Sequence, residues 1–420
     1  MKRFIAILLV GLAAGQAMAA TSSQVLDIYA GLFGRTILRP GALPELASLT
    51  LPDLADTNRA IVSIEDQLKQ IHLSVVRDGN KFMWILPDDW RNSPLVAQLN
   101  RLQSPASEDS TNAGYSYNLQ GVDLDQALEI FAYLRGRTIL RPILHSAPFN
   151  LKTQSSLTRS EASHAFGVVL AMNGIATVDD GNKFVWILPA DWRNSAMAAQ
   201  LDRLQLLPAD VSTNSEYSYN FQGLDLNQTL EIYADLCART LLRPMLPSNP
   251  IYLRTTTTLT RNEAIHAFHV VLAMNGIATV DDGDKFVRVV SFNQLSQVQA
   301  SAPKTELGAA LIDPGQIQKS LRDTNADPRN QRPGMSDATP PITAYHLVEY
   351  YAELSNQKAQ PPKQMFQTPI FFKIVTPLSK PELLYAITTT LALNHFKIVP
   401  GDRDTITLEQ ITPSKKRFGD

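Results

Sequence analysis

The chain has 420 residues, with 38 basic and 40 acidic side chains and a formal net charge of -2. A nearly neutral chain without long runs of one charge is not expected to have nucleic acid or anionic lipid as its main partner. Its single cysteine, Cys237, excludes an internal disulfide, so stability must come from apolar cores, for which an apolar content of 44% is ample.

Residues 1–19 have the three parts of an export signal. Lys2 and Arg3 form a basic start, residues 4–14 form an apolar stretch, and a small-residue cleavage motif ends at Ala19. The apolar stretch is too short to span a membrane comfortably, and no later stretch is long enough, so we expect no integral membrane segment. The mature chain is expected to be exported: periplasmic in a cell with two membranes and extracellular in a cell with one.

After the signal, a segment that ends in Arg-Pro returns at a fixed interval. Arg39, Arg141 and Arg243 each precede a proline, and successive members are 102 residues apart. A fixed period is the mark of tandem copies of one folded unit. The period also argues against an enzyme, because an enzyme usually needs one asymmetric site, whereas a repeat array presents surface.

The second copy, residues 115–189, shows the elements of one unit in order. An alternating strand leads to Asp123, which is a suitable N-cap for a helix that ends at Gly136. Two short strands follow, and Thr158 and Glu161 then form the capping box of a second helix. A hairpin with its turn at Gly181 ends the copy. The order β-α-β-β-α-β-β predicts an α+β module with two helices on one face of a small mixed sheet.

The same pattern extends along the chain to four modules. The third copy closely matches the second, the first lacks the opening strand and the capping box, and a diverged fourth copy follows a Pro-rich stretch. The predicted segments are a signal peptide at 1–19, an atypical module 1 at 20–87, a helical linker at 88–114, module 2 at 115–189, a helical linker at 190–216, module 3 at 217–291, a Pro-rich flexible linker at 292–341, module 4 at 342–413 and a tail at 414–420.

The last strand of the hairpin is apolar on both faces in copies 1 and 2. It carries Trp84 in copy 1 and Trp186 in copy 2, whereas copy 3 has Arg288 at this position. One face of such a strand packs on the module's own helices, so the other face needs a second cover. Copy 3 also lacks the Asp-Trp-Arg-Asn-Ser start of the linker. We therefore predict that the helical linkers pack over the two tryptophans.

Glu263, His266 and His269 are weak candidates for a metal site. The two histidines lie one turn apart on the second helix of module 3. Because no further ligand has a recognisable spacing, we predict no metal and no cofactor. The sequence also lacks a nucleophile elbow, a phosphate-binding glycine loop and a catalytic Cys-His pairing, so we predict no catalytic residues and no enzyme activity.

Five residues are candidates for interfaces between modules or subunits. Arginine is enriched in interfaces, and Arg39, Arg141 and Arg243 recur at one repeat position. His164 and His266 also share a position, on the side of the second helix away from its apolar face. A side chain at this position is expected to face solvent or a partner.

The order of these elements resembles the periplasmic N-domains of secretins, the ring-building modules of type II and related secretion channels. Residues 124–142 and 157–189 carry the resemblance, with their counterparts in the other copies. Secretins follow such modules with a long β-rich gate and barrel region, and no such region follows module 4 in this sequence. The resemblance implies a soluble array of modules, not a pore, whose modules pack against other subunits and dock to envelope components.

Two functions fit these observations. The first is an exported, non-enzymatic scaffold or accessory protein of a secretion-type envelope assembly, with other envelope or secretion proteins as partners and a homo-oligomer as one form. The alternative is a periplasmic binding module that captures an exported peptide or glycan between repeats. Rings or stacks in solution favour the scaffold, and a strict monomer favours capture. The module outline also resembles an RNA-binding KH domain, but the basic GxxG loop of that domain is missing, so we predict no nucleic-acid partner.

Overall fold

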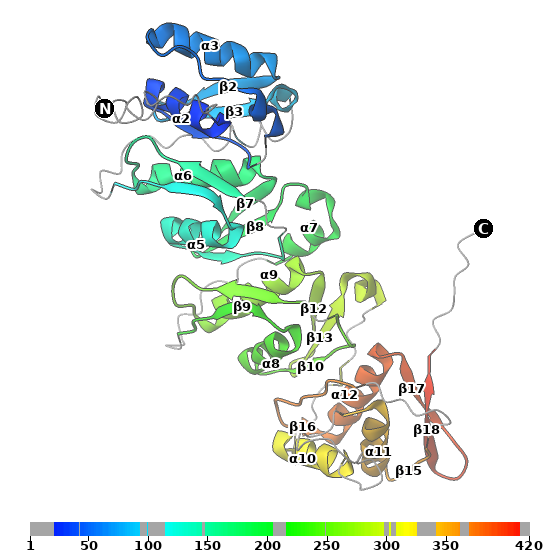
Figure 1. Cartoon of the computed structure of the whole chain (residues 1–420). Coiled ribbons are helices and arrows are strands. Elements are labelled where there is room, and N and C mark those ends of the chain that lie inside the picture. Colours follow the sequence, from blue (N-terminus) through cyan, green and yellow to red (C-terminus); the bar gives the residue numbers. More distant parts are fainter. Residues whose placement is uncertain are drawn as a thin grey trace, which may run out of the picture. The chain divides into compact units, whose positions relative to one another are not determined.

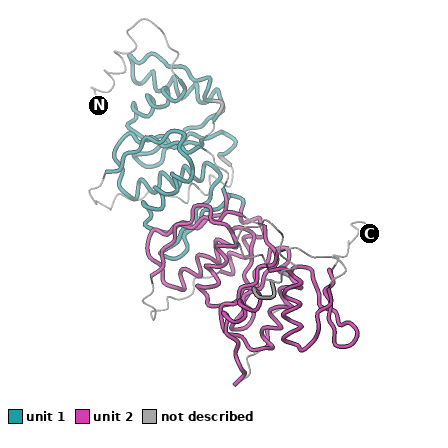
Figure 2. The backbone as a smooth tube through the Cα atoms, turned by 60° about the horizontal axis from the view of Figure 1, so that its bottom comes forward, with its two compact units in different colours: residues 1–139, 144–191 teal, residues 140–143, 192–420 magenta. Residues whose placement is uncertain are grey.

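The computed structural model of the chain describes residues 21–41, 43–92, 99, 114–144, 148–204, 216–247, 249–297, 302–303, 308–325, 342–361 and 369–411. The chain divides into two compact units (Figure 2): unit 1 comprises residues 1–139 and 144–191, and unit 2 comprises residues 140–143 and 192–420. The chain is a tandem array of small α+β modules, each with helices packed on a small mixed sheet (Figure 1). The predicted signal peptide lies outside the described residues.

Module 1, in unit 1, starts its described part with a helix. Thr21 and Gln24 form a capping box at the start of this helix, and Gly34 ends it in the left-handed conformation with a φ of 63°. Strand β3 lies between β1, to which it is parallel, and β2, to which it is antiparallel. The elements are α2 (Ser22–Phe33), β1 (Thr36–Leu38), η1 (Pro44–Ser48), α3 (Thr57–Gln70), β2 (Leu73–Asp78), β3 (Phe82–Pro87) and η2 (Asp88–Asn92).

Module 2, in unit 1 except for residues 140–143, has the complete predicted order. Asp123 caps the first helix by accepting a hydrogen bond from the Asp125 N–H, and Thr158 and Glu161 form the capping box of the second helix. Strand β8 lies between β7 and β5, and β4 pairs antiparallel with β6. The elements are β4 (Asn118–Val122), α5 (Leu124–Arg135), β5 (Thr138–Leu140), β6 (Phe149–Lys152), α6 (Arg159–Met172), β7 (Ile175–Asp180) and β8 (Phe184–Pro189).

Unit 2 opens with the linker helix α7, which packs against α9 of module 3. Module 3 repeats the caps of module 2, with Asp225 at the start of the first helix and the box of Thr260 and Glu263 at the start of the second. The elements are η3 (Trp192–Asn194), α7 (Ala196–Leu201), β9 (Asn220–Leu224), α8 (Leu226–Cys237), β10 (Thr240–Leu242), β11 (Ile251–Arg254), α9 (Arg261–Met274), β12 (Ile277–Asp282), β13 (Phe286–Ser291) and η4 (Phe292–Gln297).

Module 4 keeps the two helices and the hairpin of the other modules and adds a helix in front of them. Strand β18 lies between β15, to which it is parallel, and β17, to which it is antiparallel. The elements are β14 (Leu311–Ile312), α10 (Pro314–Asn325), α11 (Ala344–Ser355), β15 (Lys358–Ala359), β16 (Leu378–Ser379), α12 (Lys380–Leu393), β17 (Phe396–Pro400) and β18 (Thr405–Gln410).

The prediction of a flexible linker over 292–341 is wrong for residues 308–325. Strand β14 pairs with β16, and α10 packs against α11. Ile317 and Leu321 of α10 are fully buried in the core of module 4. Two apolar residues four positions apart form too short a pattern to reveal a helix in a polar stretch, so sequence reasoning missed α10.

Strand β3 contributes side chains to two hydrophobic cores. Met83 and Ile85 belong to the core of module 1, whereas Phe82, Trp84 and Leu86 belong to the core that contains helix α6 of module 2. Successive side chains of a strand point to opposite faces, so one short strand serves both modules. The second cover predicted for Trp84 is confirmed, and the next module contributes to that cover. From the linker, Leu99 joins the same core as Trp84.

Candidate functional site

Within each unit, charged side chains are buried where one module meets the next, a contact that we call the module junction. In unit 1 the sheet of module 1 meets helix α6 of module 2. Lys81 Nζ lies 2.7 Å from Glu161 Oε2, and only 10% of the Glu161 side chain is exposed. Lys81 Nζ also donates to the Ser156 carbonyl at 3.3 Å. This ion pair therefore ties the β2–β3 turn to the first turn of α6.

The backbone fixes both members of this ion pair. The Lys81 carbonyl accepts a hydrogen bond of 2.8 Å from the Thr36 N–H, which ties the turn to β1. The Glu161 carboxylate accepts a hydrogen bond of 2.8 Å from the Thr158 N–H in the capping box, so one carboxylate starts the helix and joins the modules. Burial alone would raise the pKa of Glu161, but the contacts with Lys81 and Thr158 outweigh burial and hold this pKa below its usual value.

Asp78 forms a second polar contact across the junction of unit 1. His164 Nε2 lies 2.7 Å from Asp78 Oδ2, and the indole N–H of Trp84 donates to the same oxygen at 3.0 Å. The two side chains of the His–Asp pair are 5% and 10% exposed. The His164 ring also lies against Phe82, with ring centroids 5.4 Å apart. His164 thus faces the preceding module of its own chain.

Two hydrogen bonds to the main chain complete this junction. The Gln154 N–H donates to Thr36 Oγ1 at 3.1 Å, and the Gly41 N–H donates to Asn173 Oδ1 at 2.9 Å. Asn173 is the C-cap of α6, and its Nδ2 donates back to the Val169 carbonyl at 2.7 Å. The residue that ends α6 therefore also holds the strand end of the preceding module.

Unit 2 repeats this junction between modules 3 and 4. Lys285 Nζ lies 2.9 Å from Glu382 Oε2, which again belongs to a capping box, here with Ser379. The two main-chain hydrogen bonds also recur, from the Val375 N–H to Thr240 Oγ1 at 3.2 Å and from the Met245 N–H to Asn394 Oδ1 at 2.8 Å. The contacts that unit 2 reproduces are Lys81 with Glu161, Gln154 with Thr36, and Gly41 with Asn173.

The carboxylate at the centre of the junction has different partners in unit 2. Tyr385 stands at the position of His164, and Arg288 stands at the position of Trp84. Asp282 accepts hydrogen bonds from Tyr385 and from Arg288 Nε, the latter at 2.6 Å. Burial alone would raise the pKa of Asp282, but these hydrogen bonds and one from the Ala302 N–H hold it below its usual value. The Trp-to-Arg difference between copies therefore changes the hydrogen-bond partner of the central aspartate, while the arrangement of the junction is the same in both units.

The three repeated arginines lie at the ends of short strands. Arg141, which belongs to unit 2, has its Cζ 4.4 Å from the ring centroid of Tyr252, and Arg243 Cζ lies 4.2 Å from that of Phe371 in module 4. Such cation–π contacts are favourable. Burial lowers the pKa of Arg243 to about 10, against the opposing effect of nearby carboxylates. Burial also lowers the pKa of Arg39, and the negative charge of Asp27 partly offsets this lowering.

Glu263, His266 and His269 are not brought together as a metal site. The part of the chain that the structure describes contains no group of three His, Cys, Asp or Glu side chains suited to a metal ion. His269 Nε2 lies 2.5 Å from Tyr233 OH, and burial lowers the pKa of His269 to about 4. Glu263 serves the capping box of α9. His266 is only 4% exposed, so of the two predicted surroundings, solvent or a partner, solvent does not apply to this residue.

At the centre of the junction of unit 1, the interface candidates from the sequence included His164 but not Asp78 or Lys81. Asp78 and Lys81 flank a Gly-Asn pair, and sequence reasoning assigns such residues to a hairpin turn. The repeat period contains a stronger signal, because Asp282 and Lys285 occupy the same two positions in module 3. A charged pair that returns on both sides of a turn indicates a contact beyond the turn itself.

Comparison of the chain with protein-family models, with curated proteins and with solved structures gives no match. Among the residues described above, no helix has the length and apolar character needed to cross a membrane. The case for a function therefore depends on the geometry of the junctions.

Proposed function

We propose that the protein is an exported, non-enzymatic scaffold or accessory protein of a secretion-type envelope assembly, which acts through protein–protein contacts. The observation that carries this proposal is the recurrence of one module junction in both units. Each junction uses a shielded Lys–Glu ion pair and the same two hydrogen bonds to main-chain N–H groups. Such contacts hold two modules as one stiff block, which is what a scaffold requires.

The resemblance to secretin N-domains supports the same proposal, because those modules build rings and dock to other envelope components. The placement of the repeated arginines is consistent with it as well. Within unit 2, Arg141 stacks on Tyr252 and Arg243 stacks on Phe371. Arg243 thus helps to join module 3 to module 4.

In-cell crosslinking tests the proposal most directly. The full-length gene would be expressed in its own host, the envelope would be crosslinked, and crosslinked peptides would be identified by mass spectrometry. We expect reproducible crosslinks to other envelope proteins. Trp84→Ala, which removes a large side chain from the junction of unit 1, should reduce them. Gln126→Ala, an exposed change on α5 outside this junction, is the matched control and should leave them unchanged.

The purified mature chain separates the scaffold from the alternative. Size-exclusion chromatography with light scattering should show rings, stacks or complexes with envelope partners for a scaffold. A chain that is strictly monomeric, forms no crosslinks to envelope proteins, and melts at a higher temperature with envelope peptides or glycans would instead be a capture module.

A further inference from the structure

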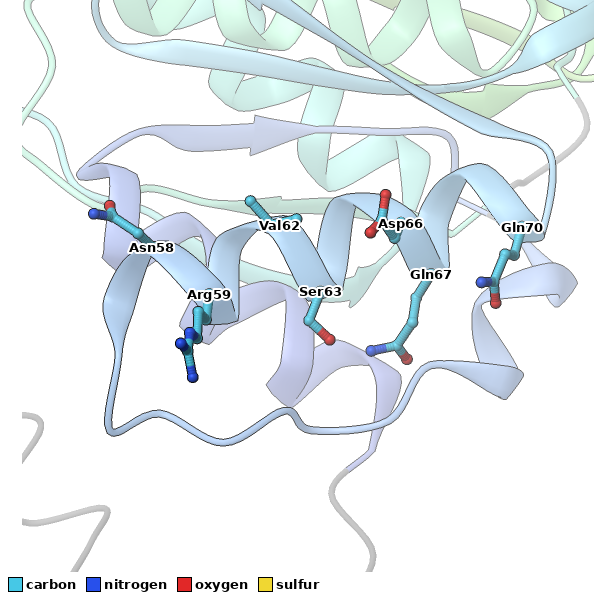
Figure 3. Close-up of a pocket in the computed structure, with 7 residues that line it drawn as sticks. All are labelled: Asn58, Arg59, Val62, Ser63, Asp66, Gln67 and Gln70. Atoms are coloured by element: carbon cyan, nitrogen blue, oxygen red, sulfur yellow. The ribbon is translucent and has the colours of Figure 1, made fainter.

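Helix α3 holds the place in module 1 that α6 holds in module 2, but the outer faces of the two helices differ. A helix that is apolar all round is buried, whereas an amphipathic helix keeps one face in water. The outer face of α6 is apolar and almost completely buried at Ala165, Val168, Val169 and Met172. The equivalent residues of α3 are polar and line a shallow groove on its surface (Figure 3), at Ser63, Asp66, Gln67 and Gln70.

On α3, the position equivalent to Glu161 of the ion pair carries a positive charge instead of a negative one. Arg59 is the third residue of α3, the place that Glu161 holds in α6 and Glu382 holds in α12. Val62 takes the place of His164 and is 55% exposed. Figure 3 shows Arg59 and Val62 on the same stretch of α3 as the polar residues above. The outer face of module 1 therefore lacks the residues that module 2 uses for docking.

Module 4 has a matching reversal on its hairpin. The Lys358 N–H donates to the Asp404 carbonyl, as the Thr36 N–H donates to the Lys81 carbonyl, so Asp404 stands where Lys81 stands in module 1. The apolar face that β3 presents to the next module is also lost. On β18, Ile406 and Leu408 point into the core of module 4, and the side chains on the other face are polar, at Thr405, Thr407 and Glu409.

We propose that these two outer faces, α3 of module 1 and the β17–β18 hairpin of module 4, exclude a second copy of the chain from the module junction. Lys81 and Lys285 are already paired with Glu161 and Glu382 within each copy. If another copy displaced that partner, Arg59 would face Lys81 or Lys285, and Asp404 would face Glu161 or Glu382, so both contacts would place like charges together. Neither face offers an apolar surface to bury.

The remaining combination, Asp404 of one copy against Arg59 of the next, has complementary charges but lacks the other contacts. Pro52 stands at the position of Gln154 and has no N–H to donate to a neighbouring strand. A homo-oligomer of this protein must therefore be built by a different surface, whether or not the protein is a scaffold.

A variant whose two outer faces carry the junction residues, which we call the opened chain, tests this inference. It would carry the residues of α6 on α3, through Arg59→Glu, Val62→His, Asp66→Val and Gln67→Val. It would also carry the residues of module 1 on the last hairpin, through Gly401→Asp, Asp404→Lys and Thr407→Trp. Two matched controls carry only one altered face each. In sedimentation experiments, we expect the mass of the opened chain to rise with concentration, while the controls keep the wild-type mass. If the opened chain stays at the wild-type mass, these residues do not exclude a second copy and the proposal fails.

A second measurement needs only conservative changes and remains decisive if the opened chain does not fold. Cys237→Ala removes the native thiol, and Val62→Cys with Thr407→Cys places one thiol on each outer face and keeps the charges of Arg59 and Asp404. Under oxidation, the inference predicts no disulfide that joins residue 62 of one chain to residue 407 of another, even if the chain oligomerises. An efficient disulfide between these two positions would show native docking of the outer faces and would overturn the inference. Loss of envelope crosslinks would not affect this result, so the scaffold proposal and this inference fail separately.

Discussion

Glu161 has two roles at once, and they can be separated by substitution. Its charge pairs with Lys81, while its carboxylate oxygen completes the capping box of α6. Glutamine can fill the third position of a capping box as well as glutamate does. Glu161→Gln therefore removes the charge and keeps the start of the helix.

A double-mutant cycle with Lys81→Met and Glu161→Gln should give a coupling free energy of about 1 kcal/mol, at the upper end for partly exposed pairs. The reason is that the Glu161 side of the pair is shielded from water. The matched control is the pair of Arg59 and Asp56, 3.5 Å apart, whose side chains are 89% and 53% exposed. Its cycle, with Arg59→Gln and Asp56→Asn, should give a coupling close to zero. Equal couplings in the two cycles would contradict this prediction.

His269 should make the stability of unit 2 depend on pH. Its pKa is lowered to about 4 in the folded chain by burial, and an unfolded histidine has a pKa near 6.5. Between these values the unfolded state binds more protons, so the free energy of unfolding falls as pH falls. The contribution of the neutral His269 to stability is fully present above about pH 6.5. The total loss should be roughly 2–3 kcal/mol by pH 4.

Denaturant unfolding at pH 7 and pH 5 checks the contribution of His269. In the wild-type chain the unfolding midpoint of unit 2 should be lower at pH 5. His269→Gln keeps a hydrogen-bonding group for Tyr233 and does not titrate, so this variant should lose most of the difference. A pH dependence that is the same in both proteins would assign the effect to other groups.

At the scale of elements, β3 shows how a strand couples its neighbours. Trp84→Ala should cost about 3–5 kcal/mol, because a large buried side chain is truncated. Trp84 belongs to the core that contains α6, so the amides of α6 in module 2 should also exchange faster with deuterium. Met83→Ala is the control, because Met83 points into the core of module 1. If α6 exchanged at the wild-type rate in Trp84→Ala, the strand would not join the two modules as described.

Helix α10 should behave as part of module 4. Leu321 is fully buried, so Leu321→Ala should destabilise module 4 by about 2–5 kcal/mol. Lys319→Ala, an exposed position on the same helix, should change the stability little. Limited proteolysis of the wild-type chain should spare residues 311–325. Early cleavage inside this range would contradict the assignment of α10 to the core.

Local chemistry made the elements predictable, and the junctions were harder because they depend on residues far apart in sequence. The capping box of Thr158 and Glu161, the N-cap Asp123 and the left-handed Gly136 are all where the sequence placed them. The contact between Lys81 and Glu161 spans 80 residues, and no local pattern connects them. The sequence of the strand predicted that Trp84 is covered, but only the fold shows which residues cover it.

At the scale of the whole molecule, the predicted export signal can be tested on the native protein. The three-part signal predicts cleavage after Ala19, so the mature chain should begin at Ala20. Mass spectrometry of the protein from its own host would measure this terminus. A protein that retains Met1, or that begins within residues 28–40, would contradict the prediction.

The sharing of β3 between two cores also has a consequence for biosynthesis. Lys81, just before β3, and Glu161, in the first turn of α6, are 80 residues apart in the chain. Ribosomes add about 5–20 residues per second, so roughly 4–16 s separate the synthesis of these two elements. During that interval the face with Phe82, Trp84 and Leu86 exists without its partner. A nascent chain at this stage presents an apolar strand to any chaperone or neighbouring chain, so slower translation of module 2 should increase aggregation of the newly made protein.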